Sequence, residues 1–456
     1  MAYFRWLLAL WVGKIVKKII RFFNITGGTA LPGLLALKID PKFLLKVRNN
    51  LEYSIVITGT NGKTTTAGII SQILKTKEQN ILNNEAGSNL KRGIVSSILG
   101  RISFWGRMPK SIGIWEVDEA AMPEVIKEIK PKILVILNLF RDQLDRYGEI
   151  DSIRKKWEGA VGHISKDSFL VLNGLDPSLN LLSSKSSAKV LYFGIKDENR
   201  SLKKVSHYAD QVFCPRCSNK LSYSEIYLSH LGIYKCKKCG FGAPSLDRWA
   251  EEVFEKDQKT FLKICGENFC ENIKIDLQGL YNVFNVLASF CVAEILGFST
   301  KEIKFALEKF SPRFGRAEKI KSNGNIYYIY LIKNPTGANE VIRTLFGKGG
   351  EKNLIIALND KIADGRDVSW IWDVDFEKIR GKIKKLLITG TRALDMALRL
   401  KYAGIKNFDL MTSNFDEAVE YLIKSKEDFW CMPTYTAMLA LRTKLAKKLG
   451  KKQFWE

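Results

Sequence analysis

Short runs of apolar and β-branched residues alternate with stretches of helical periodicity along most of the chain. Residues 54–58 (SIVIT) have the composition of a buried strand, and a helix is predicted from about residue 64 to residue 75. Further strands are predicted at residues 112–117, 133–138 and 169–173, each followed by a polar turn and a helical pattern. Strands that alternate with helices favour an α/β fold with a mostly parallel sheet, whose ligands gather at the carboxyl ends of the strands.

The alternation stops near residue 205 and restarts near residue 326. Residues 205–246 are rich in Cys, Lys and Tyr and have no helical period, whereas a helix is predicted again at residues 280–296. We therefore predict a central domain (residues 49–312) with an insertion at 205–246, followed by a Rossmann-like α/β domain (residues 313–456) after a junction at 312–316. Strands of this last domain are predicted at residues 326–332, 353–359, 385–390 and 429–433.

Residues 1–48 are predicted to form a basic amphipathic helix and a linker, with a turn at 31–33 and a short linking helix at 34–50. The uncharged stretch 6–13 is far shorter than the about 20 apolar residues that span a bilayer. The helix therefore either lies in a membrane interface or packs on the protein's own body or on a partner. Its cations share one face at spacings of three and four (Lys14, Lys17, Lys18 and Arg21), and its apolar residues lie mainly on the other (Leu8, Trp11, Val12, Ile15, Ile19 and Phe22).

The chain carries a formal charge of +24, from 72 basic and 48 acidic residues. Such an excess can serve nucleic-acid binding, attraction to an anionic membrane, or plain solvation by lysine. The basic residues are spread along the whole chain, whereas a nucleic-acid-binding surface concentrates charge with interleaved aromatic side chains. We expect a cytoplasmic protein without a nucleic-acid partner, and peripheral contact of residues 1–23 with the inner face of the plasma membrane stays open.

Four of the eight cysteines form two Cys-x-x-Cys pairs, Cys214 with Cys217 and Cys236 with Cys239. Two such turns can close a tetrahedron of thiolates around one Zn²⁺, and four thiolates leave no open coordination position. The predicted zinc site is therefore structural. The pattern favours a reducing compartment, in which the other four cysteines are expected to be buried, unpaired thiols: Cys265, Cys270, Cys291 and Cys431.

A phosphate-binding loop is predicted where the strand at 54–58 meets the following helix. The sequence from residue 58 reads TGTNGKTTT, in which two glycines let the backbone approach phosphate and Lys63 can reach the β and γ phosphates. The Thr64 hydroxyl can bind Mg²⁺. The general pattern has an earlier glycine where this chain has Ile57, so the strand–loop–helix context carries the assignment. The predicted ATP-binding residues of the loop are Gly59, Thr60, Asn61, Gly62, Lys63, Thr64 and Thr65.

This loop resembles that of the Mur ligases and folylpolyglutamate synthases, which phosphorylate a carboxylate with ATP and let an amine displace the phosphate. Further similar motifs follow in order along the chain. Glu119 in W-E-V-D-E matches a position that helps to hold Mg²⁺, Asn282 in G-L-Y-N-V-F-N matches an asparagine that touches adenine, and Arg316 lies in a G-R-x-E junction motif. Two motifs depart from the family pattern, since Gln143 replaces a histidine in N-L-F-R-D-Q-L-D and Leu175 replaces an aspartate in the adenosine-contacting N-G-L-D.

Other features resemble the MurT family of Mur-like subunits: the cysteine insertion, the stretch 138–149, K-N-P-T-G-A-N (333–339) and A-D-G-R-D-V-S-W (363–370). Members of that family work with GatD, a glutamine amidotransferase subunit that releases ammonia. The resemblance implies a heterodimer in which the C-terminal domain contacts GatD. It also implies that Asp367 supplies the acid of the partner's catalytic triad, with Asp364 as the alternative.

The same resemblance implies a reaction of peptidoglycan biosynthesis. ATP phosphorylates the α-carboxylate of D-glutamate in the stem peptide of lipid II, and ammonia then yields D-isoglutamine. A Mur or folylpolyglutamate-type ligase that adds an amino acid stays open, as does an ATP-dependent zinc-ribbon protein that binds nucleic acid. Gln143, the insertion and the turn at Asp367 favour amidation, with ATP, Mg²⁺ and structural Zn²⁺ as cofactors.

Overall fold

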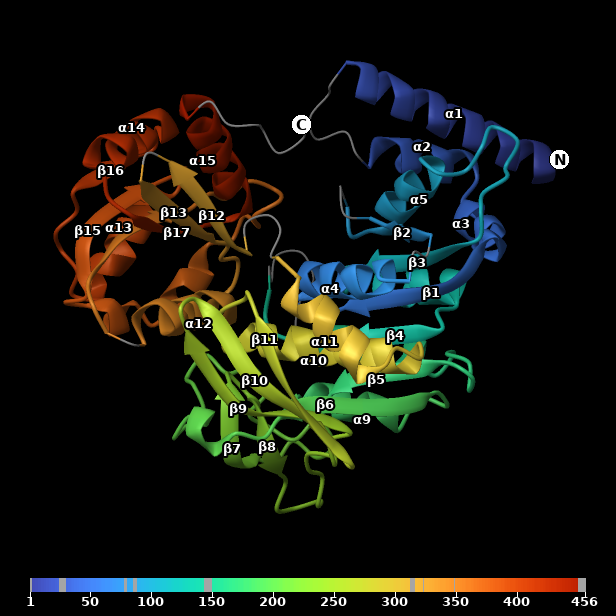
Figure 1. The fold of residues 1–456 in the computed structure, drawn as a ribbon, viewed down its shortest axis with the longest axis horizontal. Coiled ribbons are helices and arrows are strands. Elements are labelled where there is room, and N and C mark those ends of the chain that lie inside the picture. Colours follow the sequence, from blue (N-terminus) through green and yellow to red (C-terminus); the bar gives the residue numbers. More distant parts are fainter. Residues whose placement is uncertain are drawn as a thin grey trace.

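Two large sheets, each accompanied by helices, lie side by side in the molecule, and a small two-stranded sheet lies at its edge (Figure 1). The computed structural model describes residues 2–23, 30–77, 80–84, 88–142, 150–311, 316–322, 324–347 and 349–449. The α/β fold class predicted from the alternating pattern is confirmed.

The larger sheet has nine strands in the order β11-β10-β9-β6-β5-β4-β1-β3-β2. All four strands predicted for this part are present and pair in parallel, namely β1 (Leu51–Thr58), β3 (Ser111–Glu116), β4 (Ile133–Ile136) and β5 (Phe169–Asn173). The prediction missed β2 (Ile81–Asn83), β6 (Lys189–Ile195) and the antiparallel strands β9 (Arg248–Lys256), β10 (Lys259–Gly266) and β11 (Phe269–Ile275). Burial largely alternates along these last three strands, so their signal was a period of two rather than a buried run.

Successive residues of β1 point to opposite faces of this sheet and into two separate cores. Ile55 and Ile57 belong to the core under α4 (Lys63–Lys75), α10 (Leu280–Ile295) and α11 (Thr300–Glu308), whereas Val56 belongs to the core on the other face. That second core is covered by the helices α5 (Lys91–Leu99), α6 (Met122–Ile129), α8 (Ile150–Val161) and α9 (Pro177–Ser183), together with the N-terminal helices.

The N-terminal segment forms α1 (Ala2–Phe22), α2 (Leu31–Ile39) and α3 (Phe43–Val47). The predicted turn at residues 31–33 is wrong, because Pro32 occupies the first turn of α2, where its missing N–H costs nothing. The predicted linking helix at 34–50 is divided, because Asp40 adopts an extended conformation between α2 and α3. No described helix is long and apolar enough to cross a membrane.

The second sheet has six strands in the order β12-β13-β17-β14-β15-β16. Its four predicted strands are β13 (Asn325–Tyr330), β14 (Lys352–Ala357), β15 (Ile383–Thr389) and β17 (Phe429–Pro433), which pair in parallel. Two edge strands were not predicted, β12 (Arg316–Ser322) and the short β16 (Leu410–Thr412). The helices of this part are α12 (Pro335–Phe346), α13 (Ala393–Tyr402), α14 (Phe415–Ser425) and α15 (Tyr435–Lys448).

The expectation of four unpaired thiols outside the Cys-x-x-Cys pairs is wrong for two of them. Cys265 and Cys270 form a disulfide, because the tight turn between β10 and β11 places them directly opposite each other, with their Cα atoms 4.1 Å apart. Cys291 and Cys431 are buried and unpaired, as expected.

Close packing of α2 on α5 leads to a first prediction. A Cβ atom on Gly33 would lie 1.9 Å from the carbonyl oxygen of Arg92, a backbone atom that cannot turn aside. We expect Gly33→Ala to lower the free energy of unfolding by about 1–3 kcal/mol, measured by denaturant titration. Gly159→Ala is the control, because nothing lies within 4 Å of its added Cβ in α8. This control should raise stability by about 0.5–1 kcal/mol, and equal effects of the two changes would contradict the argument.

Candidate functional site

The predicted phosphate loop is a tight turn between β1 and α4, and its two glycines are required by geometry. Gly59 and Gly62 have φ angles of +128° and +96°, which other residues rarely adopt. A Cβ atom on Gly62 would lie 2.1 Å from the Oδ1 atom of Asn285. Since α4 begins at Lys63, the backbone N–H groups of its first turn lie beside this loop, where the start of a helix favours an anion.

Asn138, at the end of β4, holds the loop from its side. The backbone N–H of Thr60 donates to the Asn138 carbonyl at 3.1 Å, and the N–H of Asn61 donates to its Oδ1 at 2.9 Å. Asn138 Nδ2 in turn donates to the Asn61 carbonyl at 3.0 Å. These three hydrogen bonds fix the loop between two neighbouring strands of the sheet.

Carboxylates from the end of β3 meet the loop. Lys63 is buried, and its Nζ lies 3.0 Å from Glu119 Oε2 and 2.5 Å from the Gly59 carbonyl. Thr64 Oγ1 donates to Glu116 Oε2 at 2.7 Å. The predicted magnesium residues Thr64 and Glu119 are therefore brought to the same strand end. Glu116, for which the sequence predicted no role, is the carboxylate that Thr64 contacts.

A cation from the second sheet completes this cluster. Lys333, between β13 and α12, has its Nζ 2.5 Å from Asp142 Oδ2. Burial by itself would raise the pKa of Glu119, but the nearby ammonium groups of Lys63 and Lys333 outweigh it and hold that pKa below its usual value. Burial also raises the pKa of Asp142, against the opposing effect of Lys333. The sequence indicated Lys333 only as part of the MurT-like motif K-N-P-T-G-A-N, since no local signal shows that it crosses between sheets.

The oxygen atoms of this cluster suit Mg²⁺, which prefers carboxylate and hydroxyl ligands. They come from Thr64, Glu116, Glu119 and Asp142. Among the described residues, Asp142 Oδ1 is buried without a hydrogen-bond partner, which leaves an acceptor for a cation. Gln143, the predicted departure from the family histidine, lies outside the described residues.

The second sheet also contacts the loop through an asparagine pair. Asn334 Nδ2 lies 3.2 Å from Asn61 Oδ1, while Asn334 Oδ1 accepts a hydrogen bond from Gly337 N and so caps α12. At the far side of that helix turn, Asn339 Nδ2 donates to the carbonyl of Asp373. The start of α12 therefore connects the nucleotide loop to Asp373. This residue follows the turn at residues 360–367, which carries Asp360, Asp364 and Asp367 and which we call the acidic turn.

The other predicted nucleotide residues lie at different distances from the loop. Asn282 lies in the first turn of α10, where its Oδ1 accepts from Asn285, the residue that faces Gly62. Arg316 is the first residue of β12, and its side chain is outside what the structure describes. Asp176, from the N-G-L-D motif, caps α9 and accepts from the backbone of Leu139, so it supports the end of β4.

The four cysteines of the insertion are brought together, as predicted. Their Sγ atoms all lie within 4.8 Å of one another, with Cys214 to Cys239 at 3.6 Å and Cys217 to Cys236 at 3.5 Å. Four thiolates about 2.3 Å from a Zn²⁺ ion would be separated by about 3.8 Å, so the donor set fits a structural zinc. Among the described parts of the chain, it is the one group of three or more Cys, His, Asp or Glu side chains whose ligand atoms lie within 4.8 Å of one another.

The insertion also reaches the nucleotide side of the central sheet. Its hairpin, β7 (Ser222–Leu228) and β8 (Leu231–Lys235), ends in a turn that carries the fully buried His230. The His230 ring lies 5.0 Å from the Phe140 ring, and its Nε2 lies 3.7 Å from Asp176 Oδ1. The carbonyl of Tyr227 accepts a hydrogen bond from Arg343 of α12. The hairpin thus packs under the loop and against the second sheet's first helix.

The two candidate acids of the turn at 360–367 differ in their surroundings. Asp364 is buried, and its carboxylate accepts from the backbone N–H of Thr436 at 2.7 Å and from the Thr436 hydroxyl. Asp367 is exposed, and its Oδ1 accepts from the N–H of Ser369 at 2.8 Å. Asp364 therefore holds the turn in place, whereas Asp367 is presented to the surface.

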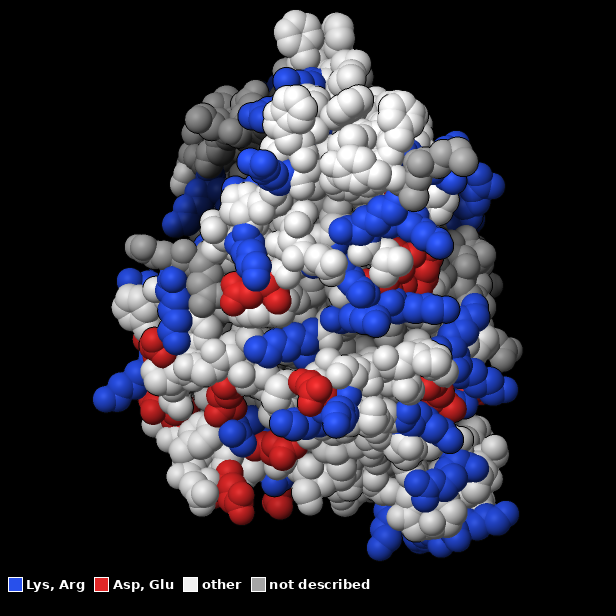
Figure 2. Space-filling view, turned by 90° about the vertical axis from the view of Figure 1, so that its right-hand side faces the viewer, with Lys and Arg blue, Asp and Glu red and all other residues white. Residues whose placement is uncertain are grey.

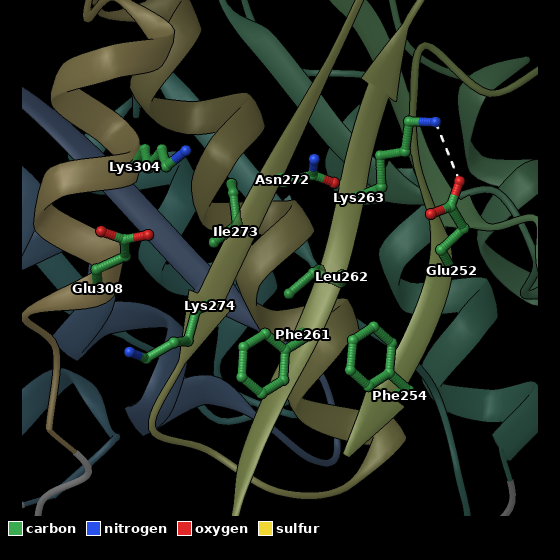
Figure 3. A pocket seen from close by; sticks show the side chains of 10 residues that line it. All are labelled: Glu252, Phe254, Phe261, Leu262, Lys263, Asn272, Ile273, Lys274, Lys304 and Glu308. Atoms are coloured by element: carbon green, nitrogen blue, oxygen red, sulfur yellow. Dashed lines mark hydrogen bonds and ion pairs between the residues drawn. The ribbon is translucent and has the colours of Figure 1, made fainter. Parts of the chain in front are cut away.

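A separate hollow lies between α11 and the outer face of β9, β10 and β11 (Figure 3). Phe254 and Phe261 stack in it with ring centroids 5.1 Å apart, and Lys263 pairs with Glu252 at 3.1 Å. It contains none of the residues predicted to bind nucleotide or metal.

Comparison with known proteins agrees with this arrangement. Residues 57–293 match the model of the Mur ligase middle domain, and residues 331–438 match that of the MurT ligase C-terminal domain. The chain is 33% identical to the MurT subunit of lipid II isoglutaminyl synthase (glutamine-hydrolyzing) from Staphylococcus aureus, over 96% of this chain and 97% of that protein. The chain belongs to the MurT family. Its Streptococcus pneumoniae relative is also 33% identical, over 92% of this chain and 93% of that one.

Solved structures outside the MurT family share the fold. A pseudomurein peptide ligase type C from Methanothermus fervidus superimposes with a TM-score of 0.66 at 21% identity, covering 93% of this chain and 85% of that one. The MurF ligase from Thermotoga maritima, in complex with ADP, gives a TM-score of 0.65 at 16% identity, covering 91% and 84%. At such identities the likeness shows a common fold. This chain combines that fold with a C-terminal sequence of the MurT type.

The thiol cluster predicts about one zinc ion per chain. We expect Cys236→Ser to lose that zinc, measured by elemental mass spectrometry, and to lower the melting temperature by roughly 10 °C. Cys431→Ser is the matched control, because Cys431 is a buried, unpaired thiol in β17, away from the cluster, so this variant should keep its zinc. A zinc-free wild-type protein of unchanged stability would contradict the assignment.

Proposed function

We propose that this chain is the ligase subunit of a glutamine-dependent amidating enzyme of peptidoglycan synthesis. In this proposal it uses ATP to activate the α-carboxylate of D-glutamate in the stem peptide of lipid II, and ammonia from a GatD-like glutaminase subunit converts it to D-isoglutamine. The observation that carries the proposal is the meeting of two domains at one cluster, where Lys333 of a MurT-type C-terminal domain pairs with Asp142 beside the Mur-type phosphate loop.

The proposed chemistry has two steps. An oxygen of the substrate carboxylate attacks the γ phosphorus of ATP, which forms an acyl phosphate and releases ADP. The nitrogen of ammonia then attacks the acyl carbon, and the C–O bond to phosphate breaks, which leaves the amide and inorganic phosphate, with the third hydrogen of ammonia carried by the phosphate. Bound Mg²⁺ would neutralise phosphate charge. Our proposal assigns phosphate binding to residues 59–65, adenine contact to Asn282 and nucleotide contact to Arg316.

Lys63 and Lys333 are the cations placed to act on the transferred phosphoryl group. Lys63 lies at the first turn of α4, next to the loop backbone. Lys333 reaches the same carboxylates from the opposite sheet. We assign to Lys333 the stabilisation of negative charge on the acyl phosphate, because a fixed cation in a buried site acts strongly on developing charge.

Our proposal assigns Asp367 the role of the acid that orients the partner's imidazolium. An exposed carboxylate can reach a second subunit, whereas Asp364 is already held by Thr436. An apolar stripe lies on the same domain, where Leu394, Leu398 and Tyr402 of α13 are 72%, 48% and 73% exposed. The Trp372 ring, from the helical turn after Asp367, contacts the Tyr402 ring with centroids 5.4 Å apart. Such a patch beside a functional carboxylate suits the proposed heterodimer interface.

The proposal also includes the organisation and location of the chain. Residues 49–312 and 313–456 would act as the ATP-binding and partner-contacting domains, with structural Zn²⁺ at the four cysteines. Residues 1–48 would form the N-terminal element of a cytoplasmic protein that works at the inner face of the membrane, where a lipid-linked substrate is found.

The test is to supply the chain and a GatD-like subunit with ATP, Mg²⁺, lipid II and either glutamine or ammonia. Mass spectrometry should detect conversion of one carboxylate to an amide with both nitrogen sources. Asp367→Asn should lower the glutamine-dependent rate by on the order of 10⁴-fold and leave the ammonia-dependent rate unchanged. Asp360→Asn, on the same acidic turn, is the control that should keep both rates. Absence of product from the wild type would overturn the function, and full glutamine-dependent activity of Asp367→Asn would overturn only the assignment of the acid.

Replacing Lys333 separates the ligase step from the glutaminase step. We expect Lys333→Met to lower both the glutamine-dependent and the ammonia-dependent rates by roughly 100-fold, because a cation is lost next to the reacting phosphate. Lys361→Met, an exposed lysine of the same domain, should leave both rates unchanged. Wild-type rates for Lys333→Met with ammonia would show that the lysine serves only domain packing.

A further inference from the structure

The basic side of α1 faces the protein body at two positions. Lys14 Nζ donates to the carbonyls of Leu99 and Ile102, and Lys17 Nζ donates to that of Ser96 at 2.7 Å. These carbonyls lie at and just beyond the C-terminal end of α5, where cations are stabilised. The cationic face that the spacing predicted therefore does not form the outer surface of the helix at Lys14 and Lys17.

The apolar residues of α1 form its outer surface instead. Trp6, Ala9 and Leu10 pack inward, whereas Ile15 and Ile19 are 50% and 46% exposed, one helical turn apart. An amphipathic helix that packs on its own protein normally presents a polar face to solvent, whereas α1 buries one set of apolar residues and exposes a second. The exposed residues, which we call the α1 apolar face, are Tyr3, Phe4, Leu8, Trp11, Ile15, Ile19, Phe22 and Phe23.

An aromatic turn from the central domain extends this face. Trp11 Nε1 donates to the carbonyl of Phe104 at 2.9 Å, and the ring of Phe104 lies 5.0 Å from Lys14 Nζ and 5.2 Å from Lys18 Nζ. The next residue, Trp105, is 80% exposed. Gly106 lies so close to Trp6 that an added Cβ would be 2.3 Å from its ring. The turn therefore packs closely against α1, and both segments expose aromatic rings to solvent.

The charge around the α1 apolar face has one sign. The first acidic residue of the chain is Asp40, and residues 100–110 contain none. Figure 2 shows this side of the molecule: its uppermost part, at the height of α1 in Figure 1, is white with blue side chains around it, and the red side chains lie lower down. The exposed cations of these two segments are Arg5, Lys18, Arg21, Lys38, Arg101, Arg107 and Lys110.

We propose that the α1 apolar face and the turn at Phe104–Trp105 dock together into the surface of a lipid bilayer that carries anionic headgroups. Exposed aromatic and aliphatic side chains enter the headgroup region, and the surrounding cations bind lipid phosphate. A second copy of this chain would set the same positive charges against each other, which argues against self-association through this face. The inference rests on the proposed function in one respect: a lipid-linked substrate gives the docking its purpose.

The experiment uses the full-length complex with the GatD-like subunit and two kinds of vesicle. One contains equal parts of phosphatidylglycerol and phosphatidylcholine, and the other contains phosphatidylcholine alone. Co-sedimentation should be strong with the first vesicles and weak with the second. We expect the triple variant Ile15→Glu, Ile19→Glu and Trp105→Glu to bind the anionic vesicles at least tenfold more weakly. The variant Arg101→Gln should bind roughly fivefold more weakly, since one cation is lost near the lipid surface.

The matched control changes charge equally at exposed apolar residues elsewhere. Phe254→Glu, Phe305→Glu and Met411→Glu replace side chains that are 51%, 54% and 44% exposed on β9, α11 and β16, and vesicle binding should be retained. Wild-type vesicle binding by the Ile15, Ile19 and Trp105 variant would overturn the proposal. So would wild-type binding that does not depend on anionic lipid, or light scattering that shows a dimer dissociated by the same substitutions.

Failure of the docking proposal can be told apart from failure of the proposed function. The triple variant should amidate a soluble stem-peptide substrate at the wild-type rate, because none of its three positions lies at the phosphate loop. Loss of vesicle binding with that rate retained supports the docking surface, whereas loss of both would indicate misfolding and overturn the interpretation of the variant. Circular dichroism and zinc content check the fold independently.

Discussion

The structure depends on a largely buried group of opposite charges at the junction of the two sheets. Lys63 and Glu119 come from the central sheet, Asp142 from the segment after β4, and Lys333 from the C-terminal domain. Removing charged groups from water costs several kcal/mol for each ion, and only close pairing offsets that cost. The Lys333–Asp142 pair joins the two domains, so Asp142 would lose this counter-charge without the C-terminal domain. The relative position of the two domains and the electrostatics of the site therefore depend on each other.

This constraint explains why the nucleotide loop is held from several sides. Asn138 fixes its backbone from β4, Asn334 reaches it from the start of α12, and Asn285 closes the space above Gly62. Under the loop, the hairpin of the cysteine insertion contacts both Phe140 and α12. A phosphate chain entering the loop has to replace the contacts that Lys63 makes with the Gly59 carbonyl and with Glu119. Nucleotide binding and the position of the C-terminal domain are therefore expected to influence each other.

The N-terminal helix illustrates how a correct pattern can leave orientation undecided. Its periodicity separates cations from apolar residues, and the structure keeps that separation. Lys14 and Lys17 nevertheless turn towards carbonyls at the end of α5, because unpaired carbonyls at a helix terminus attract cations. The apolar stripe is left outside. Packing on the body uses one face of the helix, and the proposed contact with a membrane would use the opposite face.

Local features of the sequence were sufficient for much of the fold and for locating the candidate groups at single positions. The β-branched runs predicted the principal parallel strands. The glycines of the phosphate loop and the two Cys-x-x-Cys turns predicted the candidate nucleotide and zinc sites, because the residues of each motif lie close together in the chain. The antiparallel strands β9 to β11 and the Cys265–Cys270 disulfide were missed, since their signals are a weak alternation and a turn geometry.

Contacts between distant segments were decided only by the tertiary structure. Lys333 and Asp142 are 191 residues apart, and no property of either residue indicates that they meet. The same holds for the difference in burial between Asp364 and Asp367, because Asp364 packs against Thr436 and that contact depends on the position of α15. Sequence alone determined which groups could do chemistry, and the fold decided which of them stand together, because burial and long-range pairing are properties of the assembled chain.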